Sequence, residues 1–177
     1  IFLFASRILK DKGILELIKA SKELNKITKN FELFIAGNVD SQNPSSVSHE
    51  EIKSWEALDY LKYMGHVNNI NDLYKKIHVA ILPSYREGLP KGLLEAAACC
   101  KPIITTDVAG CRDVVIDGKN GILVNPKNSD ELFLAMKKMV QNKKIRLAMG
   151  KEGRNFVKKN FLLENTVKNL IHLYKNC

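Results

Sequence analysis

The sequence predicts an α/β fold, a Rossmann-like doubly wound parallel sheet. Two observations lead to this prediction. Short apolar runs rich in β-branched residues alternate along the chain with segments whose apolar residues recur at helical spacing. The apolar runs are continuous, which is typical of parallel strands that helices cover on both faces. With 177 residues, the chain can bury a core as a single domain.

The expected elements follow this alternation in order. Strands are predicted at the continuous apolar runs, residues 1–5, 31–36, 61–65, 79–83, 102–105 and 121–124. Helices are predicted where the apolar period is 3.6, at residues 14–24, 52–56, 70–76, 90–98, 130–141, 145–159 and 164–174. The polar stretch 38–48 is expected to be a long surface loop. No strand is expected after residue 129, so residues 129–177 should form a helical tail that packs on the sheet or on a partner domain.

Composition narrows the class of protein. Hydrophobic residues make up 45% of the chain and charged residues 27%, as in ordinary globular domains. No apolar run approaches the roughly 18 residues that span a bilayer, and residues 1–4 are too short for a signal peptide. The cysteines have neither CxxC nor metal-ligand spacing, so free thiols and a cytoplasmic location are expected. Because the chain opens in strand-like sequence without Met, we expect a piece of a longer protein.

The net charge of +9 has three possible explanations. Lysines spread over amphipathic helices can form a solvated face and nothing more. They can also attract the anionic inner leaflet of the cell membrane or a phosphorylated substrate. Nucleic acid is disfavoured as a partner, because no reading motif accompanies the charge.

Polar residues follow the predicted strands and should gather at one edge of the sheet, where open parallel sheets bind ligands. Arg7 and Lys12 follow the first strand, and residues 84–92 follow the fourth strand and precede a helix. Gly88 permits close backbone approach, and Pro90 suits the first helical position. The N–H groups at this helix start, together with the two cations, predict a diphosphate site.

Glu87 and Glu95 bracket the same helix start. Carboxylates accept hydrogen bonds from sugar hydroxyls, so this pair suits a polyol. Each residue also has a simpler explanation when taken alone. Glu95 can merely complement the helix dipole, and Arg7 and Lys12 can be solvated surface charges.

Four motifs in sequence order together resemble glycosyltransferase family 4, which contains the glycosyltransferase group 1 domain. Residues 86–96 read REGLPKGLLEA and resemble the E-x7-E motif of that family. Residues 6–13, SRILKDKG, resemble the start of its group 1 domain. Residues 106–110, TDVAG, and 117–124, DGKNGILV, are similar to its later blocks. The resemblance extends from residue 1 to about residue 161.

The resemblance implies the C-terminal, donor-binding domain of a GT-B glycosyltransferase, which retains configuration and needs no metal or other cofactor. The implied catalytic residues, on the donor diphosphate and sugar, are Arg7, Lys12 and Glu87. The residues implied to bind the sugar, phosphate, ribose and base of the substrate are Gly88, Leu89, Pro90, Glu95, His66 and Val67. His78, which precedes a strand, is expected to be structural.

The resemblance also implies partners. We expect a UDP-linked hexose or N-acetylhexosamine donor and a bacterial acceptor, either a growing capsule or lipopolysaccharide chain or a lipid-linked oligosaccharide. Peripheral association with the inner membrane face is expected, and binding of nucleic acid is not. The N-terminal acceptor domain is absent, so the isolated chain should be largely inactive.

Two features of the sequence need comment against the family pattern, and three rival functions remain open. Gly37 stands alone where the family commonly has a glycine pair, and residues 161–174 resemble a closing helix that can cross to the other domain. The rivals are a GT-B-like sugar-nucleotide epimerase, a phosphorylase, and a non-catalytic nucleotide-binding domain. A dinucleotide oxidoreductase is disfavoured, because no G-x-G-x-x-G motif follows the first strand.

Overall fold

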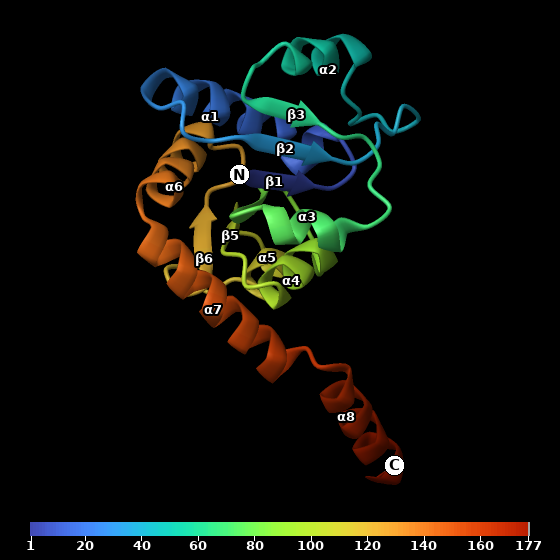
Figure 1. Ribbon diagram of the computed structural model, residues 1–177. Helices are drawn as coiled ribbons and strands as arrows, with labels where there is room; N and C mark the ends of the chain where they lie inside the picture. Colours follow the sequence, from blue (N-terminus) through green and yellow to red (C-terminus); the bar gives the residue numbers. More distant parts are fainter. Residues whose placement is uncertain (177) are drawn as a thin grey trace.

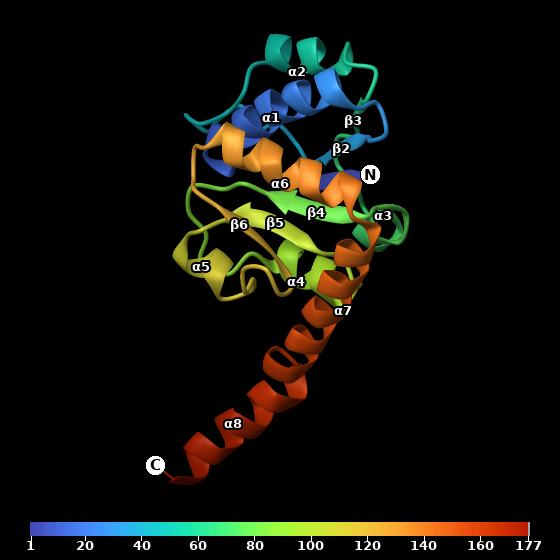
Figure 2. The same cartoon turned by 90° about the vertical axis from the view of Figure 1, so that its left-hand side faces the viewer.

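The computed structural model describes residues 1–176 and contains a six-stranded sheet between two layers of helices (Figures 1 and 2). The strands are β1 (Phe2–Ala5), β2 (Leu33–Ala36), β3 (Leu61–Tyr63), β4 (Val79–Leu82), β5 (Ile103–Thr106) and β6 (Gly121–Val124). All neighbouring strands are parallel, in the order β3-β2-β1-β4-β5-β6. This is the strand order of the Rossmann fold, and it confirms the predicted doubly wound sheet.

Burial on both faces explains why the strands read as continuous apolar runs. Every residue of β4 and β5 is buried, and so are the first three residues of β1. These strands lie in the middle of the sheet, where helices cover both surfaces. A strand with one solvent-facing side would instead alternate between apolar and polar residues.

The helices divide between the two faces. The helix α1 (Ile14–Ile27) packs against α6 (Ser129–Gln141) on one face, and α4 (Lys91–Ala98) packs against α7 (Lys143–Asn160) on the other. A short 3-10 turn, η1 (Lys10–Lys12), precedes α1. The remaining helices are α2 (His49–Glu56), α3 (Ile70–Lys76), α5 (Ala109–Arg112) and α8 (Leu163–Asn176).

Among the differences from the prediction, two helix starts and one missed helix have a clear physical reason. The helix α2 starts at His49, before the predicted residue 52, because Ser48 and Glu51 form a reciprocal capping box. The helix α4 starts at Lys91, and Pro90 is its N-cap with φ −74° and ψ 94°, not its first helical residue. The helix α5 was not predicted, because four residues are too short to show a helical period.

The helices of the predicted C-terminal tail differ in how they pack. The helices α6 and α7 pack on the domain as predicted, whereas α8 projects away from it (Figure 1). The apolar side chains Val167, Ile171, Leu173 and Tyr174 of α8 are exposed. Within residues 1–176, no helix is both long enough and apolar enough to cross a membrane.

Candidate functional site

The loops that follow β1, β4 and β5 meet at the carboxyl edge of the sheet. Between the loops after β1 and β4 lies a cavity of about 200 Å³, whose floor is formed by β1, β4 and the start of α4. Of the predicted site residues, the cavity is lined by Lys12, Glu87, Leu89 and Pro90. Crevices of this kind, at the carboxyl ends of parallel strands, are where such sheets bind ligands.

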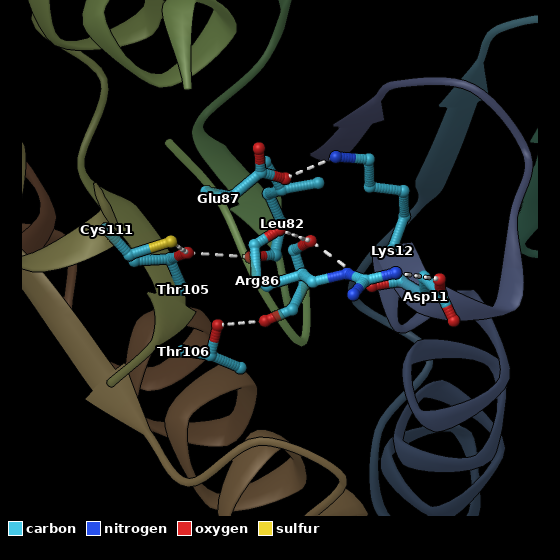
Figure 3. Close-up of polar contacts among 9 residues, drawn as sticks. Asp11, Lys12, Leu82, Arg86, Glu87, Thr105, Thr106 and Cys111 are labelled. Carbon is cyan, nitrogen blue, oxygen red and sulfur yellow. Dashed lines mark hydrogen bonds and ion pairs between the residues drawn. The ribbon is translucent and has the colours of Figure 1, made fainter. Parts of the chain in front are cut away.

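An ion pair between Lys12 and Glu87 dominates the cavity (Figure 3). Lys12 Nζ donates to Glu87 Oε1 at 2.7 Å, and their side chains are only 19% and 12% exposed. Lys12 ends η1, and the left-handed residue Gly13 (φ 72°) then turns the chain into α1. A Cβ at Gly13 would lie 2.0 Å from the carbonyl oxygen of Pro83, so the two loops touch backbone to backbone. Their close contact fixes the cation beside the carboxylate.

The loop that carries Glu87 is held in place at several points. The buried Ser84 hydroxyl donates to the carbonyls of Asp11 and Arg86, at 3.2 and 3.1 Å. The Ser84 carbonyl in turn accepts from the hydroxyl of Thr106 in β5 (Figure 3). The Tyr85 hydroxyl donates to Glu16 Oε1 at 2.7 Å, which joins the loop to α1. A loop bound to three elements in this way is preorganised for a ligand.

The short helix α5, which follows β5, packs against the backbone of the loop that carries Glu87 and Gly88. A Cβ on Gly110 would lie 2.0 Å from the carbonyl oxygen of Gly88 and 2.4 Å from that of Glu87. Only glycine therefore allows α5 to approach this backbone. A Cβ on Gly88 itself would meet nothing within 4 Å, so the opposite side of the loop is open to a ligand.

The N-terminus of α4 opens into the same cavity. Its N-cap, Pro90, provides no side-chain cap, and its first turn holds Lys91 and no acidic residue. A lysine at the positive end of a helix dipole is unfavourable unless an anion lies nearby. Lys91 lines the cavity together with Lys12, so the cavity has two cations and a helix N-terminus directed at one space. This arrangement suits a phosphate group.

Tyr74 of α3 links the cavity to Glu95. Its hydroxyl donates to the Gly92 carbonyl at 2.9 Å and to Glu95 Oε2 at 3.4 Å. Burial, and then the Glu95 carboxylate, raise the pKa of the Tyr74 phenol, so this group stays a neutral donor. The exposed Glu95 lies on the second turn of α4, where its free oxygen can accept from a ligand. Tyr74 was not predicted as a site residue, because in the sequence it fits the apolar positions of the helix expected at residues 70–76.

The other predicted residues lie at the same edge but outside this cavity. Arg7 is 61% exposed, pairs with Asp40 at 3.0 Å, and lines a neighbouring pocket together with Lys12. His66 and Val67 follow β3, where His66 is exposed and Val67 packs against the core.

Arg86 was also missed, although it stands next to Glu87 in the chain. Its guanidinium pairs with Asp11 at 3.4 Å (Figure 3). Arg86 also lines the neighbouring pocket, together with Arg7. Arg7, Lys12 and Arg86 therefore each have one carboxylate partner. In the part of the chain that the structure describes, no group of three His, Cys, Asp or Glu side chains could hold a metal ion.

The fold and this edge together define a Rossmann-like ligand-binding domain whose site suits a phosphorylated polyol. Comparison with known proteins gives the family. A match to glycosyl transferases group 1 covers residues 1–156. The chain therefore belongs to the group 1 glycosyltransferase family, as the four motifs predicted.

Curated relatives support this assignment. The chain is 28% identical over 158 residues to the capsular polysaccharide biosynthesis glycosyltransferase CapM of Staphylococcus aureus, covering 89% of this chain and 41% of that protein. It is 32% identical over 153 residues to the N,N'-diacetylbacillosaminyl-diphospho-undecaprenol alpha-1,3-N-acetylgalactosaminyltransferase of Campylobacter jejuni, covering 86% of this chain and 39% of the relative. The chain thus spans less than half the length of these relatives.

Solved structures support the fold. Sucrose-phosphate synthase from Thermosynechococcus elongatus matches with a TM-score of 0.86 and 25% identity, over 99% of this chain and 44% of that one. Anabaena HepE in complex with UDP matches with a TM-score of 0.89 and 19% identity, over 99% of this chain and 48% of that one. The predicted fold class, the Rossmann-like domain of GT-B glycosyltransferases, is therefore confirmed.

Proposed function

We propose that this chain is the donor-binding domain of a retaining glycosyltransferase that uses a UDP-linked hexose or N-acetylhexosamine. The observation that carries the proposal is the Lys12–Glu87 pair, which lies in a cavity beside the uncapped start of α4. Solved neighbours of the same fold contain UDP or UDP-glucose, which favours a uridine nucleotide. The relatives that act on surface polysaccharide and diphospho-undecaprenol favour an acceptor of that class.

The charges in the cavity would serve the departure of the diphosphate. The bond between the anomeric carbon and the diphosphate oxygen breaks, and the electron pair leaves with UDP. The acceptor oxygen bonds to the anomeric carbon as its hydroxyl loses a proton to an oxygen of the departing diphosphate. Lys12, Arg7 and the N–H groups at the start of α4 would stabilise the charge that develops on the leaving group. Because these groups supply positive charge, we propose that transfer needs no metal, and activity of the complete enzyme should survive a chelator.

The carboxylates would bind the sugar and the ribose. Glu87 lies in the cavity beside Lys12, so its second oxygen can accept from a hydroxyl of the donor sugar. Glu95, which the Tyr74 hydroxyl contacts, would accept from the ribose hydroxyls. The backbone of Gly88, Leu89 and Pro90 would line the path between sugar and phosphate. The loop with His66 and Val67 would lie beside the base.

The acceptor would bind in a second domain outside this chain. Because the chain covers less than half of its relatives, we infer that the remaining part supplies the acceptor site. The whole protein would then build a bacterial capsule, lipopolysaccharide or lipid-linked oligosaccharide at the cytoplasmic face of the membrane, with peripheral attachment. The isolated chain should bind donor weakly and transfer little sugar.

Calorimetric titration of the chain with UDP, GDP, ADP and UDP-N-acetylglucosamine tests this proposal. We expect binding of the uridine nucleotides only, and a loss of at least tenfold in UDP affinity for Glu95→Ala, because hydrogen bonds to a charged group contribute about 1.5–3 kcal/mol. The control is Glu56→Ala, which removes an exposed carboxylate of α2 far along the chain. An equal loss for both variants, or equal binding of all nucleotides, would contradict the assignment.

Product analysis separates transfer from the rival activities. The complete enzyme, incubated with a labelled UDP-sugar, should release UDP only when an acceptor is present. An epimerase would convert the donor without an acceptor, a phosphorylase would need inorganic phosphate, and a non-catalytic domain would leave the donor intact.

A further inference from the structure

The helix α7 carries an unusual concentration of positive charge. Seven of its 18 residues are Lys or Arg, and one, Glu152, is acidic. At 100° per residue, Lys143, Arg154, Leu147, Lys158, Lys151 and Lys144 fall in that angular order within an arc of about 100°. We call these six residues the α7 stripe. Glu152 lies about 80° beyond its edge, so no carboxylate interrupts the stripe.

The stripe faces solvent along its whole length. All six residues are exposed, and Leu147 has 65% of its surface accessible. In the part of the chain that the structure describes, Lys143, Lys151 and Lys158 form no ion pair. From residue 143 to 158 the helix rises about 22 Å, so the stripe presents unpaired cations over a distance that several small anions would occupy.

A cavity of about 260 Å³ extends the stripe at the start of α7. It is lined by three cationic residues, Lys101, Lys143 and Arg146, and by no acidic residue of the described chain. Lys101 Nζ donates to the Ile77 carbonyl at 2.9 Å, and Arg146 donates to the Met139 and Val140 carbonyls, so both cations are fixed at its wall. This cavity concentrates positive charge in one place.

The stripe is also rigidly placed. Outside the stripe, α7 buries Met149, Gly150 and Gly153, and a Cβ on Gly150 would lie 2.0 Å from the Cys100 carbonyl oxygen. The helix therefore seats directly on the turn between α4 and β5. From the edge where β4 and β5 begin, α7 runs over α4 (Figure 2).

We propose that the α7 stripe and its adjoining cavity bind the anionic headgroups of a lipid bilayer. The cavity would take one phosphate group, the lysines would face neighbouring headgroups, and Leu147 would enter the interfacial layer. An exposed leucine among lysines is typical of surfaces that lie on membranes. Single-stranded nucleic acid would favour aromatic side chains on which bases stack, and the stripe contains none. This inference locates the membrane attachment that the proposed function includes.

Flotation with vesicles tests the surface on the 177-residue chain. We expect binding to vesicles of phosphatidylcholine mixed with phosphatidylglycerol and no binding to pure phosphatidylcholine. Each basic residue near an anionic bilayer increases partitioning roughly fivefold, so Lys143→Gln/Lys151→Gln/Lys158→Gln should weaken binding about a hundredfold. Glutamine keeps helix propensity, and none of these side chains packs in the core.

The matched control carries the same change of charge elsewhere. Lys19→Gln/Lys22→Gln/Lys29→Gln removes three exposed lysines in and after α1, and should keep at least half of the binding. Equal losses of vesicle binding in both variants would overturn the proposal that the α7 stripe is the binding surface, because net charge alone would then explain binding. Binding that survives the α7 variant but is lost in Val167→Ser/Ile171→Ser would assign the surface to α8 instead. Binding of an RNA oligonucleotide in place of vesicles would also overturn the proposal.

Nucleotide titration of the same variants keeps this test separate from the proposed function. The α7 variant should bind UDP as the unchanged chain does, which also shows that it is folded. Loss of UDP binding in Glu95→Ala with unchanged vesicle binding would be the complementary result. If the chain bound no nucleotide but still required the stripe for vesicles, only the donor-site proposal would fail.

Discussion

The two edges of the sheet differ in whether their basic side chains are paired with carboxylates. At the carboxyl edge, Arg7, Lys12 and Arg86 each face one carboxylate, and close contact between two loops fixes Lys12 beside Glu87. At the opposite edge, Lys101, Lys143 and Arg146 line a cavity without an acidic partner. Paired charges in a rigid setting discriminate among ligands by shape, whereas unpaired charges attract any anionic surface. The same domain thus separates selectivity from general attraction.

The largest expected effect compares two glycines with the same backbone conformation. Gly13, at the carboxyl edge, has φ 72°, and Gly118, before β6, has φ 71°. A Cβ would strike the Pro83 carbonyl at Gly13 but would meet nothing within 4 Å at Gly118. Gly13→Ala should therefore lower the free energy of unfolding by about 3 kcal/mol, and Gly118→Ala by about 1 kcal/mol. Urea denaturation measures both; similar losses would show that the carboxyl edge is not the more tightly packed one.

The next effect compares a paired with an unpaired lysine. Lys12→Met leaves the Glu87 carboxylate, which is 12% exposed, without its cation and should cost about 2 kcal/mol of stability. Lys143→Met removes no partner and should change stability by less than about 0.5 kcal/mol. Adding Glu87→Gln to Lys12→Met should restore part of the loss. If the double variant were as unstable as the sum of the single ones, the pair would contribute nothing to folding.

The smallest effect concerns Arg7, which is 61% exposed and pairs with Asp40. Solvent screens such a pair, so Arg7→Ala should leave stability nearly unchanged. It should weaken UDP binding about fivefold, the effect of one exposed charge on a phosphate, and leave uridine binding intact. Titrations with both ligands at low and high salt measure the difference. An equal loss for UDP and uridine would remove Arg7 from the diphosphate site.

The fold could be predicted from the sequence because burial leaves a direct pattern. Strands covered on both faces are mostly apolar, and all six were predicted in order. Boundaries were less certain where local hydrogen bonds decide them. The start of α2 could have been found from Ser48 and Glu51, which have the spacing of a capping box. The helix α5 left no signal, since its position depends on contact between Gly110 and a distant loop.

The sequence predicted which residues form the site better than it predicted their contacts with one another. Strand order brings Lys12 and Glu87 to one edge, and sequence motifs pointed to both. Their direct pairing across 75 residues depends on loop conformations that no periodicity encodes. Tyr74 and Arg86 were missed for a similar reason, because each contacts a carboxylate distant in the sequence, Glu95 or Asp11. The functional roles of the predicted residues remain predictions that the titrations above would test.

The projection of α8 has a consequence for the behaviour of the chain in solution. A compact domain of this length has a radius of gyration of about 16 Å. The 14 residues of α8 add an arm of about 21 Å beyond the body, so small-angle scattering should report an elongated particle with a long tail in its distance distribution. Because Ile171, Leu173 and Tyr174 are exposed on that arm, the same profile should shift with protein concentration as arms from different molecules associate.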